Sequence, residues 1–307
     1  MALIEYNLFG EKRDKVATAI QRMKSFEPPE GYFLAFSGGK DSVVLLRIAQ
    51  MAGVKFDAHY SVTTVDPPEA MRFVRDKHPE IAWERPEKPM HRLIVEAKTP
   101  PTRNRRYCCT KLKEIHGVGR VVATGVRWAE SINRKANQGA VTIFGGGGVQ
   151  QKAEAQGAIY RQTDRGGLVL NLDNDENRRT VEQCYRTNKT LVNPIIDWED
   201  EDVWEFIRAE NIPYCGLYDD GIKRVGCVGC PLGGYDNQKR DFARWPGYYK
   251  QYLHAFDEMV KVRQTRDMEN RFAWNCADDV MRWWLGDKRK GINFDQLGLD
   301  DIEEAEL

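Results

Sequence analysis

Short apolar runs alternate with longer amphipathic stretches through the first two-thirds of the chain. Buried strands are predicted at 31–36, 54–62, 81–83 and 121–125, where apolar runs end in turn-forming residues. Helical spacing lies before or between them, at 11–25, 43–51 and 68–77. Alternating strands and helices imply right-handed crossovers and a parallel sheet. We therefore expect an α/β fold with a doubly wound, mostly parallel sheet in a nucleotide-binding domain at 1–235.

This pattern weakens in the middle of the chain. Residues 136–190 are polar and aperiodic, and 145–148 are four consecutive glycines. We interpret 136–190 as a flexible or hairpin insertion in the α/β domain. A glycine loop that cradles a phosphate is the alternative, and a glycine run with no helix after it supports that alternative only weakly.

Regular patterning returns in the last third. An amphipathic helix is predicted at 200–210, and 240–285 is helical and aromatic. Tyr248, Tyr252 and Phe256 recur every four residues, which places them on one helix face. We interpret that face as core rather than as a base-stacking surface, and predict a helical C-terminal extension at 236–307.

Composition is that of an ordinary globular protein. The 307 residues include 46 Lys and Arg and 46 Asp and Glu, so the net charge gives no general argument for nucleic-acid binding. Neither a signal-peptide pattern nor an 18-residue apolar stretch is present, so we expect no membrane span and a cytoplasmic location. Clustered cysteines in that compartment more often bind metals or do redox chemistry than form disulfides.

A candidate phosphate loop lies between the first predicted strand and its helix. Its glycines let backbone amides approach an oxyanion, and the helix start adds partial positive charge. Lys40 supplies a further charge, and Asp41 caps the helix or helps to hold Mg²⁺. The spacing differs from the Walker pattern. The predicted loop residues are Ser37, Gly38, Gly39, Lys40, Asp41 and Ser42.

Four of the seven cysteines have spacing that suits one metal centre. Cys108 and Cys109 are adjacent, and Cys227 and Cys230 form a C-x-x-C pair. Four thiolates fit Zn²⁺ or a [4Fe-4S] cluster, and spacing alone does not decide between them. Unligated thiols or a redox C-x-x-C pair are the alternatives. The other three, Cys184, Cys215 and Cys276, are interpreted as buried small residues or bystanders.

Positive charge is concentrated in residues 101–135. This block contains nine Lys or Arg residues and two acids in a chain that is neutral overall. We interpret it as charge gathered around a bound anion and the Cys108–Cys109 pair; a solvated basic face is the alternative.

Four motifs in order resemble the phosphoadenosine phosphosulfate (PAPS) reductase family, a PP-loop branch of the adenine nucleotide alpha-hydrolase superfamily. They are the loop 37–42, the Cys-Cys and Cys-x-x-Cys pairs, the element 124–134, and the pair of segments 193–198 and 202–204. The resemblance implies an alpha-hydrolase-like fold that binds ATP, adenylyl sulfate or PAPS at the strand ends. The four-cysteine version resembles the branch that carries a [4Fe-4S] cluster.

The resemblance also implies roles for individual residues. Catalytic roles fall to Lys40, Asp41 and Arg127. Besides the loop and Arg127, the implied nucleotide-binding residues are Asp66, Gly125, Ser131 and Arg134. The implied metal ligands are Cys108, Cys109, Cys227 and Cys230.

One family element has no match in this chain. Sulfonucleotide reductases share a cysteine within the motif Glu-Cys-Gly-x-His. The residues on either side of Cys276 do not match this motif. Our leading hypothesis is therefore a cluster-bearing ATP pyrophosphatase or adenylating enzyme in sulfur transfer, similar to the DndC- and SspD-like proteins of DNA phosphorothioation. The runner-up is an adenylyl-sulfate or PAPS reductase. A third hypothesis is a non-catalytic nucleotide or nucleic-acid binding module of a modification or defence complex.

The leading hypothesis carries expectations about ligands and partners. It implies bound ATP, Mg²⁺ and the cluster. The partners it implies are DNA and a cysteine desulfurase or sulfur-carrier protein, and the sequence is compatible with an oligomer.

Overall fold

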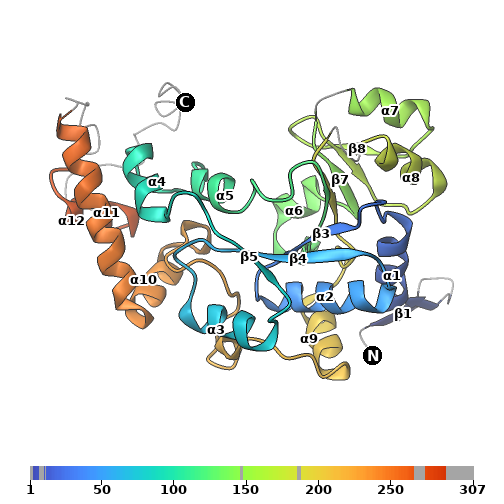
Figure 1. Ribbon diagram of the computed structural model, residues 1–307, viewed down its shortest axis with the longest axis horizontal. Coiled ribbons are helices and arrows are strands. Elements are labelled where there is room, and N and C mark those ends of the chain that lie inside the picture. The colour runs from blue at the N-terminus through green and yellow to red at the C-terminus, as the bar shows by residue number, and fades with distance from the viewer. Residues whose placement is uncertain are drawn as a thin grey trace. The chain divides into compact units, whose positions relative to one another are not determined.

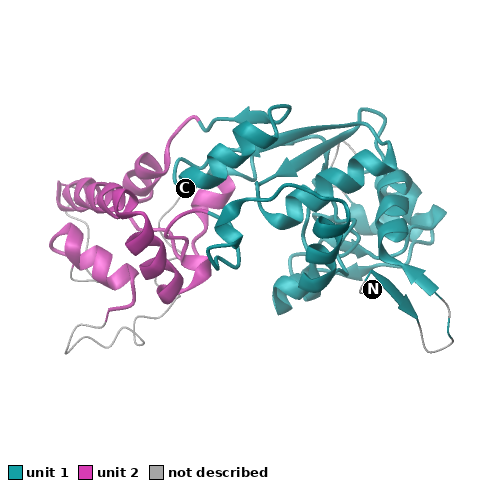
Figure 2. Cartoon of the chain, turned by 90° about the horizontal axis from the view of Figure 1, so that it is seen from below, with its two compact units in different colours: residues 1–86, 111–226 teal, residues 87–110, 227–307 magenta. Residues whose placement is uncertain are grey.

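The computed structural model describes residues 3–6, 10, 12–145, 148–184, 188–265 and 274–287. Contacts divide the chain into two compact units, each built from two segments (Figure 2). Unit 1 comprises residues 1–86 and 111–226, and unit 2 comprises 87–110 and 227–307. The predicted domain boundary at 235/236 stays a prediction. The contact units are separated at 226/227 instead, and residues 87–110 belong to the second unit.

Unit 1 is organised around one eight-stranded sheet. Its first five strands pair in parallel and the last three join antiparallel, so the predicted α/β fold with a mostly parallel sheet is confirmed. In spatial order the strands are β5 (Ala82–Glu84), β4 (Phe56–Ser61), β3 (Tyr32–Phe36), β6 (Val121–Ala123), β10 (Thr190–Val192), β7 (Val141–Ile143), β9 (Leu168–Leu170) and β8 (Arg161–Gln162).

Helices pack along this sheet (Figure 1). α2 (Lys40–Ala52) follows β3 and packs between α1 (Lys15–Ser25) and α9 (Asp200–Ala209). α3 (Pro68–Lys77) follows β4 over the predicted range. Apart from Met51, the apolar side chains of α2 are almost completely buried, which fixes the helix that begins at the candidate phosphate loop.

The predicted start of the first helix is wrong by four residues. Asp14 accepts hydrogen bonds from the amides of Val16 and Ala17 at 2.9 and 3.0 Å, so α1 begins at Lys15. The residues just before it form β2 (Lys12–Asp14), which pairs antiparallel with β1 (Ile4–Tyr6).

Residues 136–190 extend the sheet with β7, β9 and β8 and add two helices, α7 (Val149–Ala155) and α8 (Asp175–Glu182). The expectation that no helix follows the glycine run is wrong, because α7 begins directly after Gly148. Only Val149 and Ala153 of α7 are buried, and two positions in seven residues give almost no periodic signal. Short η1 (Trp128–Glu130), α6 (Ile132–Asn137) and η2 (Gly216–Tyr218) complete unit 1.

Unit 2 is helical. It contains α4 (Met90–Ala97), η3 (Pro231–Gly233), α10 (Tyr235–Arg244), α11 (Pro246–Thr265), α12 (Ala277–Trp284) and the first residues of α5 (Tyr107–Leu112). The Trp284 ring lies 4.8 Å from that of Tyr252 and 5.4 Å from that of Phe256, between ring centroids. Tyr252 and Phe256 are buried, so the interpretation of their helix face as core is confirmed. Among the described residues, no helix is long and apolar enough to cross a membrane.

Candidate functional site

The order of strands creates a switch point between β3 and β6. After β3 the chain adds β4 and β5 on one side, and later adds β6 and β10 on the other. Open α/β sheets bind ligands beyond the carboxyl ends of the strands at such a point. The phosphate loop follows β3, and Gly125 and Arg127 follow β6, so these predicted residues meet there.

Gly125 allows the end of β6 to approach the start of α2. A Cβ atom on Gly125 would lie 2.7 Å from the Asp41 carbonyl oxygen, which is too close for any side chain. Gly38 has φ +71°, a conformation that glycine adopts without strain. These two glycines therefore shape the backbone of the phosphate loop.

Hydroxyl groups hold the loop closed. The Ser42 hydroxyl donates to the Gly39 carbonyl at 2.8 Å, and the Ser37 oxygen lies 3.3 Å from that of Ser42. The Lys40 amide, at the start of α2, donates to the Tyr218 hydroxyl at 2.8 Å. Tyr218 thus occupies an amide of the kind that binds anions at helix starts.

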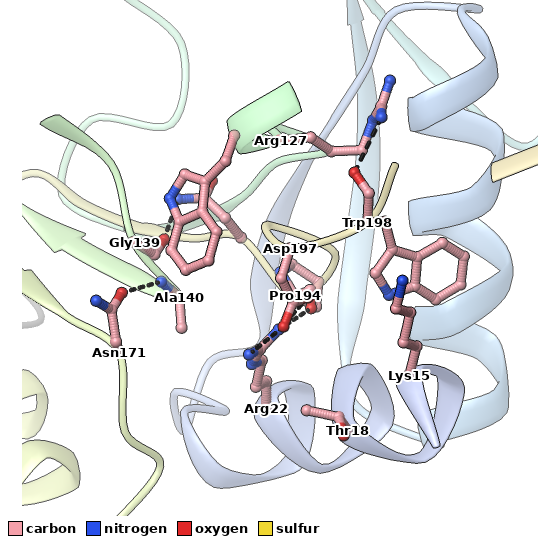
Figure 3. Close-up of polar contacts among 12 residues, drawn as sticks. Lys15, Thr18, Arg22, Arg127, Gly139, Ala140, Asn171, Pro194, Asp197 and Trp198 are labelled. Carbon is pink, nitrogen blue, oxygen red and sulfur yellow. Dashed lines mark hydrogen bonds and ion pairs between the residues drawn. The ribbon is translucent and has the colours of Figure 1, made fainter. Parts of the chain in front are cut away.

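Four charged side chains form a network behind the loop. Arg127 is 1% exposed; its Nε lies 2.7 Å from Asp41 and its Nη2 lies 2.5 Å from Asp200. Its Nη1 donates to the Trp198 carbonyl at 3.0 Å, a contact that Figure 3 shows. The Lys40 ammonium lies 3.4 Å from Asp200 and 3.8 Å from Asp41. Buried cations need such anionic partners, so the network stabilises the loop only as a complete set.

The network lowers the pKa of Asp200. Burial opposes ionisation of Asp200, but the Arg127 hydrogen bond and the nearby Lys40 charge outweigh it and lower the pKa of Asp200. The Asp200 side chain is 60% exposed, whereas that of Asp41 is 21% exposed. Both side chains are therefore partly open to solvent beside the candidate phosphate loop.

Helix α1 supports the segment that carries Trp198 and Asp200. Arg22 binds Asp197 through two bonds of 2.9 Å and donates to the Pro194 carbonyl at 2.8 Å (Figure 3). Lys15 lies 2.6 Å from Asp202, which is 1% exposed. Two cations of α1 therefore hold both ends of the segment 194–202.

The remaining predicted nucleotide residues lie after β4, in a turn, and after β6, at the start of α6. Asp66 accepts the Thr63 amide at 2.7 Å and is 6% exposed. Ser131 caps α6 by accepting the Arg134 amide at 3.2 Å, and Arg134 forms an ion pair with Glu130. Their role in nucleotide binding stays a prediction.

Sequence reasoning missed two residues of this site. Asp200 follows the 193–198 segment but has no motif role, and Tyr218 lies in no motif. Asp200 is 73 residues from its partner Arg127, and Tyr218 is 178 residues from its partner Lys40. The local excess of acid at 197–205 is the one signal in the sequence for Asp200.

The basic block at 101–135 does not form a single basic face. Arg120 binds Asp57 at 2.5 Å, Arg127 is buried in the network, and Arg134 pairs with Glu130. Several other members of the block are exposed. Its charge is divided between structural ion pairs and solvent-facing side chains.

All four proposed metal ligands lie in unit 2. A hydrogen bond to Cys109, burial, and the charges of Cys109, Cys227 and Cys230 raise the pKa of Cys108. Cys108 therefore lies close enough to each of the other three thiols to interact with it. In the part of the chain that the structure describes, no group of three or more His, Cys, Asp or Glu side chains is arranged to hold a single metal ion.

The other cysteines have different environments. Cys184 and Cys215 are buried, as expected for small core residues, and burial raises the pKa of Cys184. Cys276 is exposed and precedes α12.

Residues 31–232 match the phosphoadenosine phosphosulfate reductase domain model. The chain therefore belongs to that family. It is 22% identical to an adenosine 5'-phosphosulfate reductase of Staphylococcus epidermidis, over 72% of this chain and 80% of that protein. It is 32% identical to the Oceanobacillus iheyensis protein of that name, over 28% of this chain and 33% of that protein.

Two solved structures show a weak overall similarity to this chain. A PAPS reductase from Candida auris in a phosphate complex has a TM-score of 0.42 and 13% identity, covering 68% of this chain and 88% of that one. An FMN adenylyltransferase from Candida glabrata with FMN and an ATP analogue has a TM-score of 0.40 and 12% identity, and the match covers 70% of this chain and 63% of that one.

Proposed function

We propose that this protein binds ATP at the phosphate loop and either cleaves it between the α- and β-phosphates or transfers its adenylate. The family match supports an enzyme that acts on nucleotides. The observation that carries the ATP assignment is the pair of carboxylates, Asp41 and Asp200, beside the loop.

A phosphate that takes over the Lys40 ammonium leaves Asp41 and Asp200 with Arg127 as their one remaining cationic partner in the network, and the uncompensated carboxylate repels a bare anion. A divalent cation between them and the phosphates removes this repulsion, and Mg²⁺ binds a few carboxylates together with phosphate oxygens. The oxygen donors of Asp41 and Asp200 fit Mg²⁺ in this way. We therefore favour a Mg²⁺–ATP complex over a sulfonucleotide that binds without metal.

The residues of the loop have separate tasks in this proposal. The backbone amides of the loop bind the pyrophosphate portion, with the Lys40 amide available only when the Tyr218 hydroxyl leaves it, and the Lys40 ammonium stabilises the charge that develops on the departing oxygen. Arg127 fixes the orientation of Asp41 and Asp200 through the bonds described above. Any direct contact between Arg127 and phosphate requires exchange of one of these partners.

A [4Fe-4S] cluster on Cys108, Cys109, Cys227 and Cys230 is the second part of the proposal. Four thiols, of which Cys108 interacts with each of the other three, are a donor set that would suit such a cluster, whose ligands need not converge on one ion. When bound, the cluster would supply electron transfer or sulfur handling. Sulfur transfer to an acceptor such as a DNA backbone, with a desulfurase or sulfur-carrier partner, is the corresponding role.

Adenylyl-sulfate reduction is the second candidate. The observation in its favour is the shared domain and the name of the Staphylococcus epidermidis relative, which aligns over 72% of this chain. In that case the same loop would hold the phosphosulfate group, and an external thiol or Cys276 would attack sulfur.

One experiment separates the two. Reconstituted full-length protein is incubated without oxygen, either with Mg²⁺ and ATP or with adenylyl sulfate and reduced thioredoxin. Pyrophosphate and AMP from ATP, with no sulfite from adenylyl sulfate, is the expected result. Sulfite release without pyrophosphate would replace the first candidate with the second. Orthophosphate as the only phosphate product would contradict the proposal.

A further inference from the structure

The C-x-x-C loop is bound through its backbone by three side chains of unit 2. The Asp241 carboxylate accepts the Gly229 amide at 2.9 Å, and the Gln238 amide donates to the Gly229 carbonyl at 3.1 Å. The Tyr252 hydroxyl donates to the Val228 carbonyl at 3.2 Å. The two residues between Cys227 and Cys230 thus have both carbonyls and one amide bound by helices α10 and α11.

These bonds lie in a closely packed environment. Gln238 is 0% exposed and Tyr252 is 3% exposed. Gln238 and Tyr252 belong to different helices, so the loop is held from two elements at once. Buried hydrogen bonds of this kind are costly to lose, because a backbone group is left without a partner.

Packing adds a further constraint at Gly229. Its φ of +71° suits glycine, and a Cβ there would lie 2.4 Å from the Phe242 ring. The Phe242 ring is itself packed 5.6 Å from that of Tyr252 and 6.0 Å from that of Trp284, between centroids. The loop therefore rests directly on the aromatic core of unit 2.

We propose that Gln238, Asp241 and Tyr252 are positioning residues that hold the C-x-x-C loop in its ligand-binding conformation before the metal centre is assembled. Small metal sites commonly form only when the metal drives folding. Here the helices supply the loop conformation instead, so Cys227 and Cys230 form a preformed half-site. The part about metal loading rests on the proposed function, whereas the part about loop conformation does not.

The test compares metal-free, reduced full-length protein with three variants. Gln238→Met, Asp241→Ala and Tyr252→Phe each remove one bond, and Asp241→Asn retains an oxygen acceptor. Exposed Gln251 and Asp236, on the same two helices, provide the matched controls Gln251→Met and Asp236→Ala. Thermal unfolding checks that each variant is folded.

Hydrogen exchange of the peptide 226–231 is the first readout. Loss of one net hydrogen bond predicts about fivefold faster exchange in each variant, with Asp241→Asn and the controls close to wild type. Equal exchange in the wild type and all three folded variants would overturn the proposal, whether or not the protein binds iron.

Reconstitution with iron and sulfide is the second readout, followed by visible absorbance. We expect the variants to lose absorbance to a chelator about fivefold faster than the wild type. If the wild-type protein binds no iron, the cluster proposal is contradicted. If its loop nevertheless exchanges slowly, and each of the three variants exchanges faster, the loop proposal remains supported.

Discussion

The three guanidinium nitrogens of Arg127 each donate a hydrogen bond to another group of the protein. Its side chain contacts two carboxylates and one carbonyl, and it is 1% exposed. The family resemblance predicts a phosphate contact for this residue. Its position instead supports a role in holding Asp41 and Asp200 at a fixed separation beside the phosphate loop.

Replacing Arg127 with methionine tests this role. Asp41 and Asp200 would lose their buried counter-charge, so we expect the free energy of unfolding to fall by about 3 kcal/mol. Arg120→Met is the control, because Arg120 pairs with Asp57 at a half-exposed site and should cost about 1 kcal/mol or less. Urea denaturation at pH 7 measures both. If both variants lose the same free energy of unfolding, the buried network contributes no more to stability than a half-exposed ion pair.

Tyr218 allows a more selective test of the phosphate loop. Burial raises the pKa of its hydroxyl to about 12, so the group is neutral and accepts the Lys40 amide at 2.8 Å. Tyr218→Phe leaves that amide without its acceptor and should lower the free energy of unfolding by about 1–3 kcal/mol. A bound phosphate oxygen would replace the lost acceptor. Pyrophosphate should therefore raise the Tm of the variant more than that of the wild type.

Tyr214→Phe is the matched control for this measurement. Tyr214 contacts the same Trp204 ring, but its hydroxyl bonds Asp219 at an exposed position. We expect wild-type stability and a wild-type response to pyrophosphate. If Tyr218→Phe and Tyr214→Phe respond alike, the Tyr218 hydroxyl has no connection with phosphate binding.

At this scale, the sequence predicted the residues that lie within local motifs. Lys40 and Asp41 follow a strand and open a helix, and that context is visible in the chain itself. Tyr218 and Asp200 reach the loop only through tertiary folding, so no spacing rule could identify them.

Helix α1 does more than cover the sheet. Arg22 and Lys15 bind the segment 194–202 at Asp197 and Asp202, and that segment supplies Trp198 and Asp200 to Arg127. The helix was predicted from its apolar face alone. Its two buried cations were not predicted, because their partners lie more than 170 residues away.

The pH dependence of stability should report the Arg22–Asp197 contact. Burial opposes ionisation of Asp197, but Arg22 and Arg13 outweigh it and lower its pKa below the ordinary 3.8. A lowered pKa stabilises the fold above about pH 4, and the contribution disappears as pH falls through the folded-state value. Asp197→Asn should therefore be about 2 kcal/mol less stable than the wild type at pH 7, with the difference shrinking below pH 4.

Denaturant titrations between pH 7 and pH 3 measure this difference. Asp173→Asn, at an exposed position, should follow the wild-type curve throughout. A difference between Asp197→Asn and wild type that stays constant down to pH 3 would rule out the ion pair as its source.

The elements themselves were predicted unevenly. The four parallel strands β3, β4, β5 and β6 were located within a few residues. β7, β9 and β10 are three residues each, and such short segments carry too few positions to show alternation. Their pairing depends on neighbours that the local pattern does not reveal.

At the scale of the whole molecule, the two proposed sites belong to different contact units. Unit 1 contains the phosphate loop, Arg127 and Asp200, whereas unit 2 contains all four clustered cysteines. The order of motifs along the chain does not show this division, because Cys108 and Cys109 lie between segments of unit 1. Residues 87–110 belong to the helical unit because their helix α4 packs against α11, which also contacts α10 and α12.

This division predicts that phosphate binding survives loss of the metal centre. All protein groups assigned to the phosphates lie in unit 1, so the Cys227→Ser/Cys230→Ser double variant should bind pyrophosphate within about a factor of two of the wild type. Lys40→Met should bind at least about tenfold more weakly, because it removes the buried cation of the loop. Titration calorimetry with Mg²⁺ and pyrophosphate on full-length protein measures both. Loss of binding in a folded double cysteine variant would mean that the cysteine loop takes part in the phosphate site.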